Sequence, residues 1–125
     1  MMIHSEFLKT TGTDWSDKAL TAGTDYYSDA IESKFSNGNA ALRFDLAADS
    51  NVTISYETSL NGADWYAPIN TSGESLTEIV TTLTSASAMT KWVVFSPQIT
   101  KFIRFKVVPN ATSTITAEYI QQEEV

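Results

Sequence analysis

Hydrophobic and polar residues alternate along most of this chain with the two-residue period of half-buried β-strands. In the clearest example, Leu42 and Phe44 fall on one side of a segment and Arg43 and Asp45 on the other. Four segments alternate in this way: 39–46, 52–57, 101–108 and 112–120. Consecutive strands of this kind often form hairpins. We therefore expect the first segment to pair antiparallel with the second, and the third with the fourth.

Two Asn-Gly pairs interrupt the alternation and predict hairpin turns. Asn37-Gly38 has the residues that tolerate the positive φ angles of a type I′ turn. Asn61-Gly62 ends the second alternating segment and leads into a tryptophan, Trp65. The stretch from Ile54 to Trp65 therefore predicts a strand, a hairpin turn and a buried aromatic side chain.

The remaining segments are less regular. Residues 27–35 predict a short strand before the first Asn-Gly turn, and residues 90–95 predict a strand rich in β-branched and aromatic residues. Between residues 70 and 90, Leu76, Ile79 and Leu83 have the spacing of a helix face, but the repeated threonines oppose a helix. We expect a strand there.

These elements predict an all-β chain: an antiparallel β-sandwich or jelly roll of about seven or eight strands without substantial helix. At 125 residues the chain is long enough for a single core. Residues 1–22 are expected to form an extended N-terminal arm or edge strand, residues 23–120 the sandwich domain, and residues 121–125 a polar tail.

The charge balance argues against nucleic acid and anionic membranes as partners, because the net charge is −7 with 15 acidic and 8 basic residues. The basic residues Arg104 and Lys106 share one face of their predicted strand, as on an ordinary solvated surface. No apolar run approaches the ~20 residues that span a bilayer. There is no cysteine, and the N-terminus does not resemble a signal peptide, so synthesis in a cytoplasm is expected.

The chain contains few residues suited to catalysis. His4 is the only histidine, so neither a catalytic triad nor a zinc site of the usual composition is expected. No glycine-rich phosphate loop occurs. The carboxylates are scattered, although a calcium ion bound by loop oxygens stays open as an alternative. We expect a non-enzymatic protein without a cofactor.

The aromatic residues are the remaining candidates for a contact surface. Trp15, Trp65 and Tyr66, together with Arg104, are the candidate interface or ligand-contact residues. A platform for a sugar ring could come from the aromatic residues Trp15, Tyr26, Tyr27, Trp65, Tyr66 and Trp92. Packing in the core and at an interface is the simpler interpretation. Adjacent residues on a strand face opposite sides, so Tyr66 is expected to face outward if Trp65 is buried.

Two motifs resemble known families. The segment Ser59-Leu-Asn-Gly-Ala-Asp-Trp65 resembles the hairpin of discoidin-like carbohydrate-binding and adhesion domains, and Lys101-Phe-Ile-Arg-Phe-Lys-Val107 is similar to their later arginine-containing strand. The order of these motifs, followed by a threonine-rich strand, is also similar to small virion structural proteins of tailed bacteriophages. The lack of cysteine and of an export signal favours the second resemblance.

The phage resemblance implies a non-enzymatic virion protein, either a capsid decoration (cement) protein or a tail or neck component. Such a protein is made in the cytoplasm of the bacterial host and is located in the virion. Its partners would be capsid or tail subunits, and a homo-oligomer such as a trimer is expected. The discoidin resemblance implies a carbohydrate-binding module instead, with Trp65, Tyr66 and Arg104 near the ligand.

Overall fold

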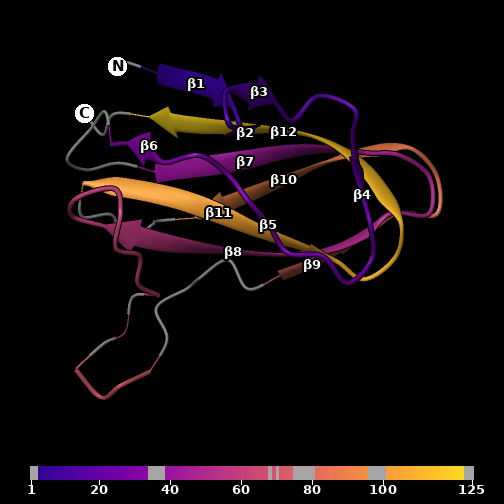
Figure 1. Ribbon diagram of the computed structural model, residues 1–125. Coiled ribbons are helices and arrows are strands. Elements are labelled where there is room, and N and C mark those ends of the chain that lie inside the picture. Colours follow the sequence, from indigo (N-terminus) through magenta and orange to yellow (C-terminus); the bar gives the residue numbers. More distant parts are fainter. Residues whose placement is uncertain are drawn as a thin grey trace.

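The chain folds as an antiparallel β-sandwich, which confirms the fold class expected from the alternation (Figure 1). The computed structural model describes residues 3–33, 39–67, 69, 71–74, 81–95 and 101–122. These residues form twelve strands, of which five have only two or three residues. None of the described residues is helical, and no helix among them is long and apolar enough to cross a membrane.

One sheet has β12 and β7 at its centre. Its strands, in spatial order, are β1 (Ile3–Phe7), β12 (Ser113–Gln122), β7 (Asn39–Leu46) and β10 (Met89–Phe95), and β4 (Lys18–Leu20) pairs with β12 on the same side as β1. The edge opposite β1 and β4 is therefore β10, which pairs with β7 over its full length.

The second sheet has β11 and β8 at its centre. Its strands, in spatial order, are β5 (Tyr26–Tyr27), β11 (Phe102–Pro109), β8 (Asn51–Ser59) and β9 (Thr81–Thr84), and β6 (Ile31–Glu32) pairs with the other end of β11. A separate two-stranded sheet consists of β2 (Lys9–Thr10) and β3 (Thr13–Asp14).

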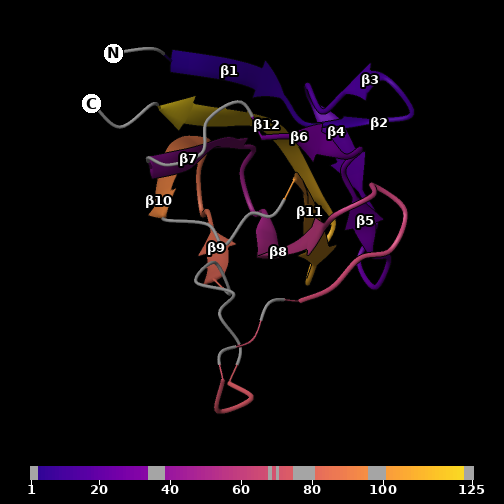
Figure 2. The ribbon, with the colours of Figure 1, turned by 90° about the vertical axis from the view of Figure 1, so that its left-hand side faces the viewer.

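The predicted hairpins between consecutive alternating strands are wrong. β7 pairs with β12 and β10, whereas β8 pairs with β11 and β9, so β7 and β8 lie in different sheets. β11 and β12 are likewise in different sheets. In Figure 2, β7 and β10 lie together on one side and β8 and β11 on the other. The connection at residues 47–50 therefore crosses between the sheets. Each strand still turns one apolar face inward, because the core between the sheets accepts that face from either side.

The core lies between the two sheets and contains the inward residues of every long strand. Three aromatic contacts connect the layers, with ring centroids 5.9 Å apart for Tyr56 and Phe95, 6.1 Å for Phe95 and Phe105, and 5.2 Å for Phe105 and Tyr119. Tyr119 is fully buried, and its hydroxyl is the one buried side-chain polar atom of the described residues without a hydrogen-bond partner.

Residues 3–20 belong to the sandwich and do not form a separate arm. β1 and β4 pair with the outer side of β12. Trp15 is fully buried with Leu8 and Leu20, and its indole Nε1 donates a hydrogen bond to Thr10 Oγ1 at 2.8 Å.

Three other predicted segments differ from the structure or lie outside it. The strand expected at 27–35 is divided into β5 and β6, and the strand expected at 70–90 appears as β9 and the start of β10. β12 extends into the expected polar tail, and Gln121 is buried there. The Asn37-Gly38 turn and the residues Leu76 and Ile79 lie outside the described residues.

Candidate binding site

The hairpin that follows β8 is folded by the side chains of Ser59 and Asn61. The backbone of Thr58 pairs with that of Tyr66 through two hydrogen bonds of 2.9 and 3.0 Å. Within the loop, Ser59 Oγ accepts from the N–H of Gly62 at 2.9 Å, and Asn61 Oδ1 accepts from those of Ala63 and Asp64 at 2.8 and 2.9 Å. The loop therefore holds its shape through side-chain to backbone hydrogen bonds.

This loop is wider than the two-residue turn that an Asn-Gly pair most often makes. Gly62 has a φ of 77°, but Asn61 is not among the residues with positive φ, as a type I′ turn would require. A β-carbon at position 62 would lie 3.7 Å from the ring of Phe102, so the strained φ is the stronger reason for glycine there. The hairpin predicted at Asn61-Gly62 is therefore present, with a loop wider than a two-residue turn.

Arg104 on β11 is held between two aromatic rings by a carboxylate. Its guanidinium carbon lies 4.4 Å from the ring centroid of Tyr27 and 4.6 Å from that of Trp65. Its Nε and Nη2 both donate to Glu57 Oε1, at 2.8 and 2.7 Å. Glu57 is directly opposite Arg104 in the pairing of β8 with β11. We refer to Tyr27, Glu57, Trp65 and Arg104 as the arginine clamp.

In the arginine clamp, Arg104 of β11 contacts three other parts of the chain. Tyr27 comes from β5, Glu57 from β8 and Trp65 from the hairpin loop, and all meet on the outer face of the second sheet. Stacking of a guanidinium on aromatic faces is worth about 0.5–1 kcal/mol at exposed sites and more when water is excluded. The clamp therefore fixes the hairpin loop against the sheet, and Arg104 is not the freely solvated side chain that its alternation suggested.

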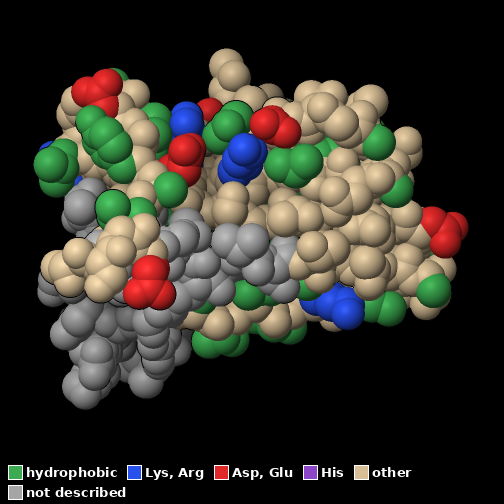
Figure 3. Space-filling view, turned by 90° about the horizontal axis from the view of Figure 1, so that it is seen from below, with side chains coloured by type: hydrophobic (Ala, Val, Ile, Leu, Met, Phe, Trp, Pro, Cys, Tyr) green, Lys and Arg blue, Asp and Glu red, His purple; other side chains and the backbone are tan. Residues whose placement is uncertain are grey.

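Lys106 extends this charged surface along β11. Its ammonium lies 3.5 Å from Asp25 Oδ2 and 5.7 Å from the ring centroid of Tyr27. Partial burial acts to lower the pKa of Lys106, but the phenol of Tyr27 and the carboxylate of Asp25 outweigh it, so the pKa is raised. Lys106 therefore stays protonated in the neutral pH range. Figure 3 shows basic, acidic and hydrophobic side chains close together on this face.

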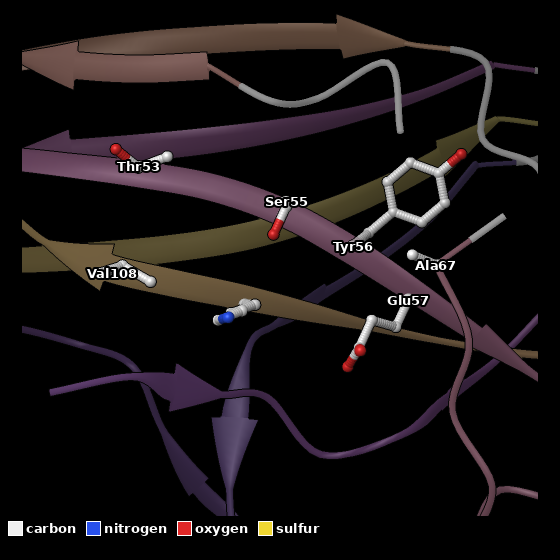
Figure 4. A pocket seen from close by; sticks show the side chains of 7 residues that line it. Thr53, Ser55, Tyr56, Glu57, Ala67 and Val108 are labelled. Carbon is white, nitrogen blue, oxygen red and sulfur yellow. The ribbon is translucent and has the colours of Figure 1, made fainter. Parts of the chain in front are cut away.

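A shallow pocket of about 370 Å³ lies beside Lys106 on the second sheet. It is lined by Thr53, Ser55, Tyr56, Glu57, Ala67, Lys106 and Val108. Figure 4 shows Ser55 and Glu57 on one side of β8 and the ring of Tyr56 extending away on the other. The lining combines an ammonium, a carboxylate and hydroxyls, which can donate and accept hydrogen bonds to a polar ligand.

The candidate contact residues therefore separate into three groups. Trp65 and Arg104 come together in the clamp, where Trp65 is half-buried and outside the core, so the buried tryptophan expected from the sequence is not found. Tyr66 faces solvent with 64% of its surface exposed. Trp15 is fully buried in the core and offers no surface to a partner, so its prediction as a contact residue is wrong. The sequence around it has no regular alternation that would have indicated its burial.

Sequence reasoning missed Glu57 as a member of the site, whereas Tyr27 was among the aromatic candidates. Glu57 faces outward in the predicted alternation, but its pairing with Arg104 depends on β8 lying beside β11. The described residues contain no group of three or more His, Cys, Asp or Glu that could hold a metal ion. His4 is in the other sheet, where its Nε2 lies 2.6 Å from Glu6 Oε2.

The fold defines this protein as a β-sandwich with a hairpin loop fixed by a stacked arginine. No known protein family matches the chain, and no curated protein or solved structure is recognisably similar to it.

Proposed function

We propose that this chain is a non-enzymatic virion structural protein that binds other virion subunits, as a capsid decoration (cement) protein or a tail or neck component. The observation that carries the proposal is the hairpin loop, a fixed element that exposes apolar side chains. Leu60, Tyr66 and Ile69 are exposed over 74%, 64% and 61% of their surfaces. The first two are in the hairpin loop and Ile69 follows it, and large exposed apolar side chains of this kind are available for contact with another protein.

The arginine clamp makes the loop suitable for recognition. Binding orders mobile segments at a cost in conformational entropy, and a loop that is already fixed avoids much of this cost. The hydrogen bonds around Asn61 and the stacking of Trp65 on Arg104 hold the loop before a partner arrives. Tyr66 is a suitable anchor, because tyrosine is enriched among the residues that contribute most to binding.

The proposal is tested by co-expressing the chain with the genes that flank it and pelleting the assembled particles. We expect the protein to sediment with heads or tails, and Tyr66→Ser to weaken this association by about tenfold or more, the usual effect of losing an anchor. Phe7→Ser, which changes an exposed aromatic residue on β1, is the matched control and should leave sedimentation unchanged. Absence of the protein from every particle, or flanking genes that encode no virion protein, would refute the proposal.

A carbohydrate-binding module is the second candidate, and the pocket beside Lys106 favours it. The pocket is lined by the Lys106 ammonium, the Glu57 carboxylate and the Ser55 hydroxyl. A hydroxylated ligand needs such a mixture of hydrogen-bond donors and acceptors. A glycan array should then detect binding that Lys106→Met reduces. If the unmodified protein binds no glycan at millimolar concentration, this second function is excluded.

A further inference from the structure

The backbone of the edge strand β10 can pair with another strand. It is in register with β7 from Met89 opposite Leu46 to Phe95 opposite Ala40, without a break. Among the strands that the structure describes, none pairs with its other side. The N–H and C=O groups of alternate β10 residues therefore point away from the sheet, where another strand can bind them.

β10 also lacks the features that usually protect an edge strand. Natural edges carry charges, prolines or bulges that prevent pairing with another chain. β10 contains no proline and no acidic residue, its pairing with β7 shows no bulge, and Lys91 is its single charge. Trp92 and Val94 are exposed over 58% and 71% of their surfaces. Apolar residues exposed on an unprotected edge indicate that a partner covers them.

The outer face beside β10 continues this apolar surface. Val94 is opposite Ala41 on β7, and Ala41 is opposite Ile120 on β12, so the three side chains form a row across the sheet. Ala41 and Ile120 are half-buried. A partner that extends the sheet beyond β10 would therefore meet Val94 at the end of an existing apolar row, with Trp92 beside it.

We propose that the partner is a second copy of this chain, whose β10 pairs antiparallel with the first about a two-fold axis at Val93. In this register Val93 is opposite Val93 of the second copy, and Trp92 is opposite Val94 of the second copy. The symmetry repeats the Trp-Val pair on the other side of the axis. Cross-strand pairs of an aromatic and a β-branched residue stabilise antiparallel sheets, so the strand is complementary to itself.

The charges disfavour the two registers with the axis closer to Lys91. With the axis at Val93, Lys91 is opposite Phe95 of the second copy, and the two lysines are four positions apart, about 13 Å along the strands. This exceeds the Debye length of about 8 Å at physiological ionic strength. An axis at Lys91 would place the lysines directly opposite, and an axis at Trp92 would leave them about 7 Å apart. The acidic residues behind the net charge of −7 are absent from β10, so they do not oppose this contact directly.

This pairing predicts a dimer and not the trimer implied by the phage resemblance. An interface that uses the same strand on both copies is isologous and closes at two subunits. The two sheets that contain β10 would become one continuous sheet across the interface. The proposal does not depend on the virion function, because it concerns the purified protein alone.

The mass of the purified protein tests the proposal. Light scattering at about 100 µM should give a dimer if the dissociation constant is in the micromolar range. Val94→Lys, which adds a charge to an exposed position, should give a monomer, whereas Leu60→Lys, the same change in the hairpin loop, should leave a dimer. A monomeric or trimeric parent protein, or a dimer that Val94→Lys does not dissociate, would overturn the proposal.

A single introduced cysteine tests the register, because the chain has none of its own. Directly opposite residues of an antiparallel pair have Cα atoms about 4.5–5.5 Å apart, within the range that a disulfide spans. Val93→Cys should therefore form a disulfide between copies under mild oxidation. Thr90→Cys is the control, since the two positions 90 would lie about 20 Å apart. Cross-linking of Thr90→Cys, or a dimer of Val93→Cys that does not cross-link, would rule out this register.

Discussion

Replacing Tyr119 by phenylalanine, which removes the side-chain hydroxyl, should stabilise the protein. Tyr119 is fully buried, its ring lies 5.2 Å from that of Phe105, and its hydroxyl has no hydrogen-bond partner among the described residues. Burying an unpartnered polar group costs about 1–3 kcal/mol. Tyr119→Phe removes this cost and keeps the ring. Loss of one oxygen leaves only a small void, so we expect a gain of about 1 kcal/mol.

The gain is measured from urea unfolding curves, and it should raise Tm by about 4 °C for a chain of this size. Tyr56→Phe is the matched control, because Tyr56 is equally buried but its hydroxyl is not among the buried polar atoms without a hydrogen-bond partner. That variant should be neutral or less stable by about 1 kcal/mol. The reasoning is refuted if both substitutions destabilise the protein to the same extent.

The pH dependence gives a second check on Tyr119. Burial raises the pKa of Tyr119, and the neighbouring carboxylate of Glu6 raises it further. Above pH ~10 the unfolded chain loses the phenolic proton while the folded chain keeps it, so this tyrosine favours unfolding by about 1.4 kcal/mol per pH unit. The stability difference between Tyr119→Phe and the parent should therefore widen between pH 10 and 11 and stay constant below pH 9.

Two further predictions concern charged side chains on the sheet surfaces. Arg104→Met should destabilise the protein by about 1–2 kcal/mol, since it removes the stacking on Trp65 and leaves Glu57 without its ion pair. Hydrogen exchange should then accelerate in the hairpin loop, and unchanged exchange would show that the clamp does not hold it. A hydrogen bond from Thr90, assisted by Arg43, lowers the pKa of Asp45 despite partial burial. Its contribution to stability is present above the unfolded pKa and is lost as pH falls below it, so urea midpoints measured from pH 6 to 3 should fall less steeply for Asp45→Asn.

The sequence alone determined which side of each strand faces the core. Phe44 is buried and Arg43 is half-exposed, as their alternation predicts. This information is local, because the side-chain direction in a strand reverses at every residue whatever the strand pairs with. The all-β fold follows from the same pattern.

Only the tertiary structure decided which strands are neighbours. A strand with one apolar face can bury it beside the next strand or across the core from it, and alternation is the same in both cases. β7 and β8 take the second arrangement, which brings β8 beside β11 and places Glu57 next to Arg104, 47 residues away in sequence. Tyr27 and Trp65 complete the clamp from two other segments. The hairpin loop was visible in the sequence, but the clamp that holds it depends on long-range pairing, which a local pattern does not record.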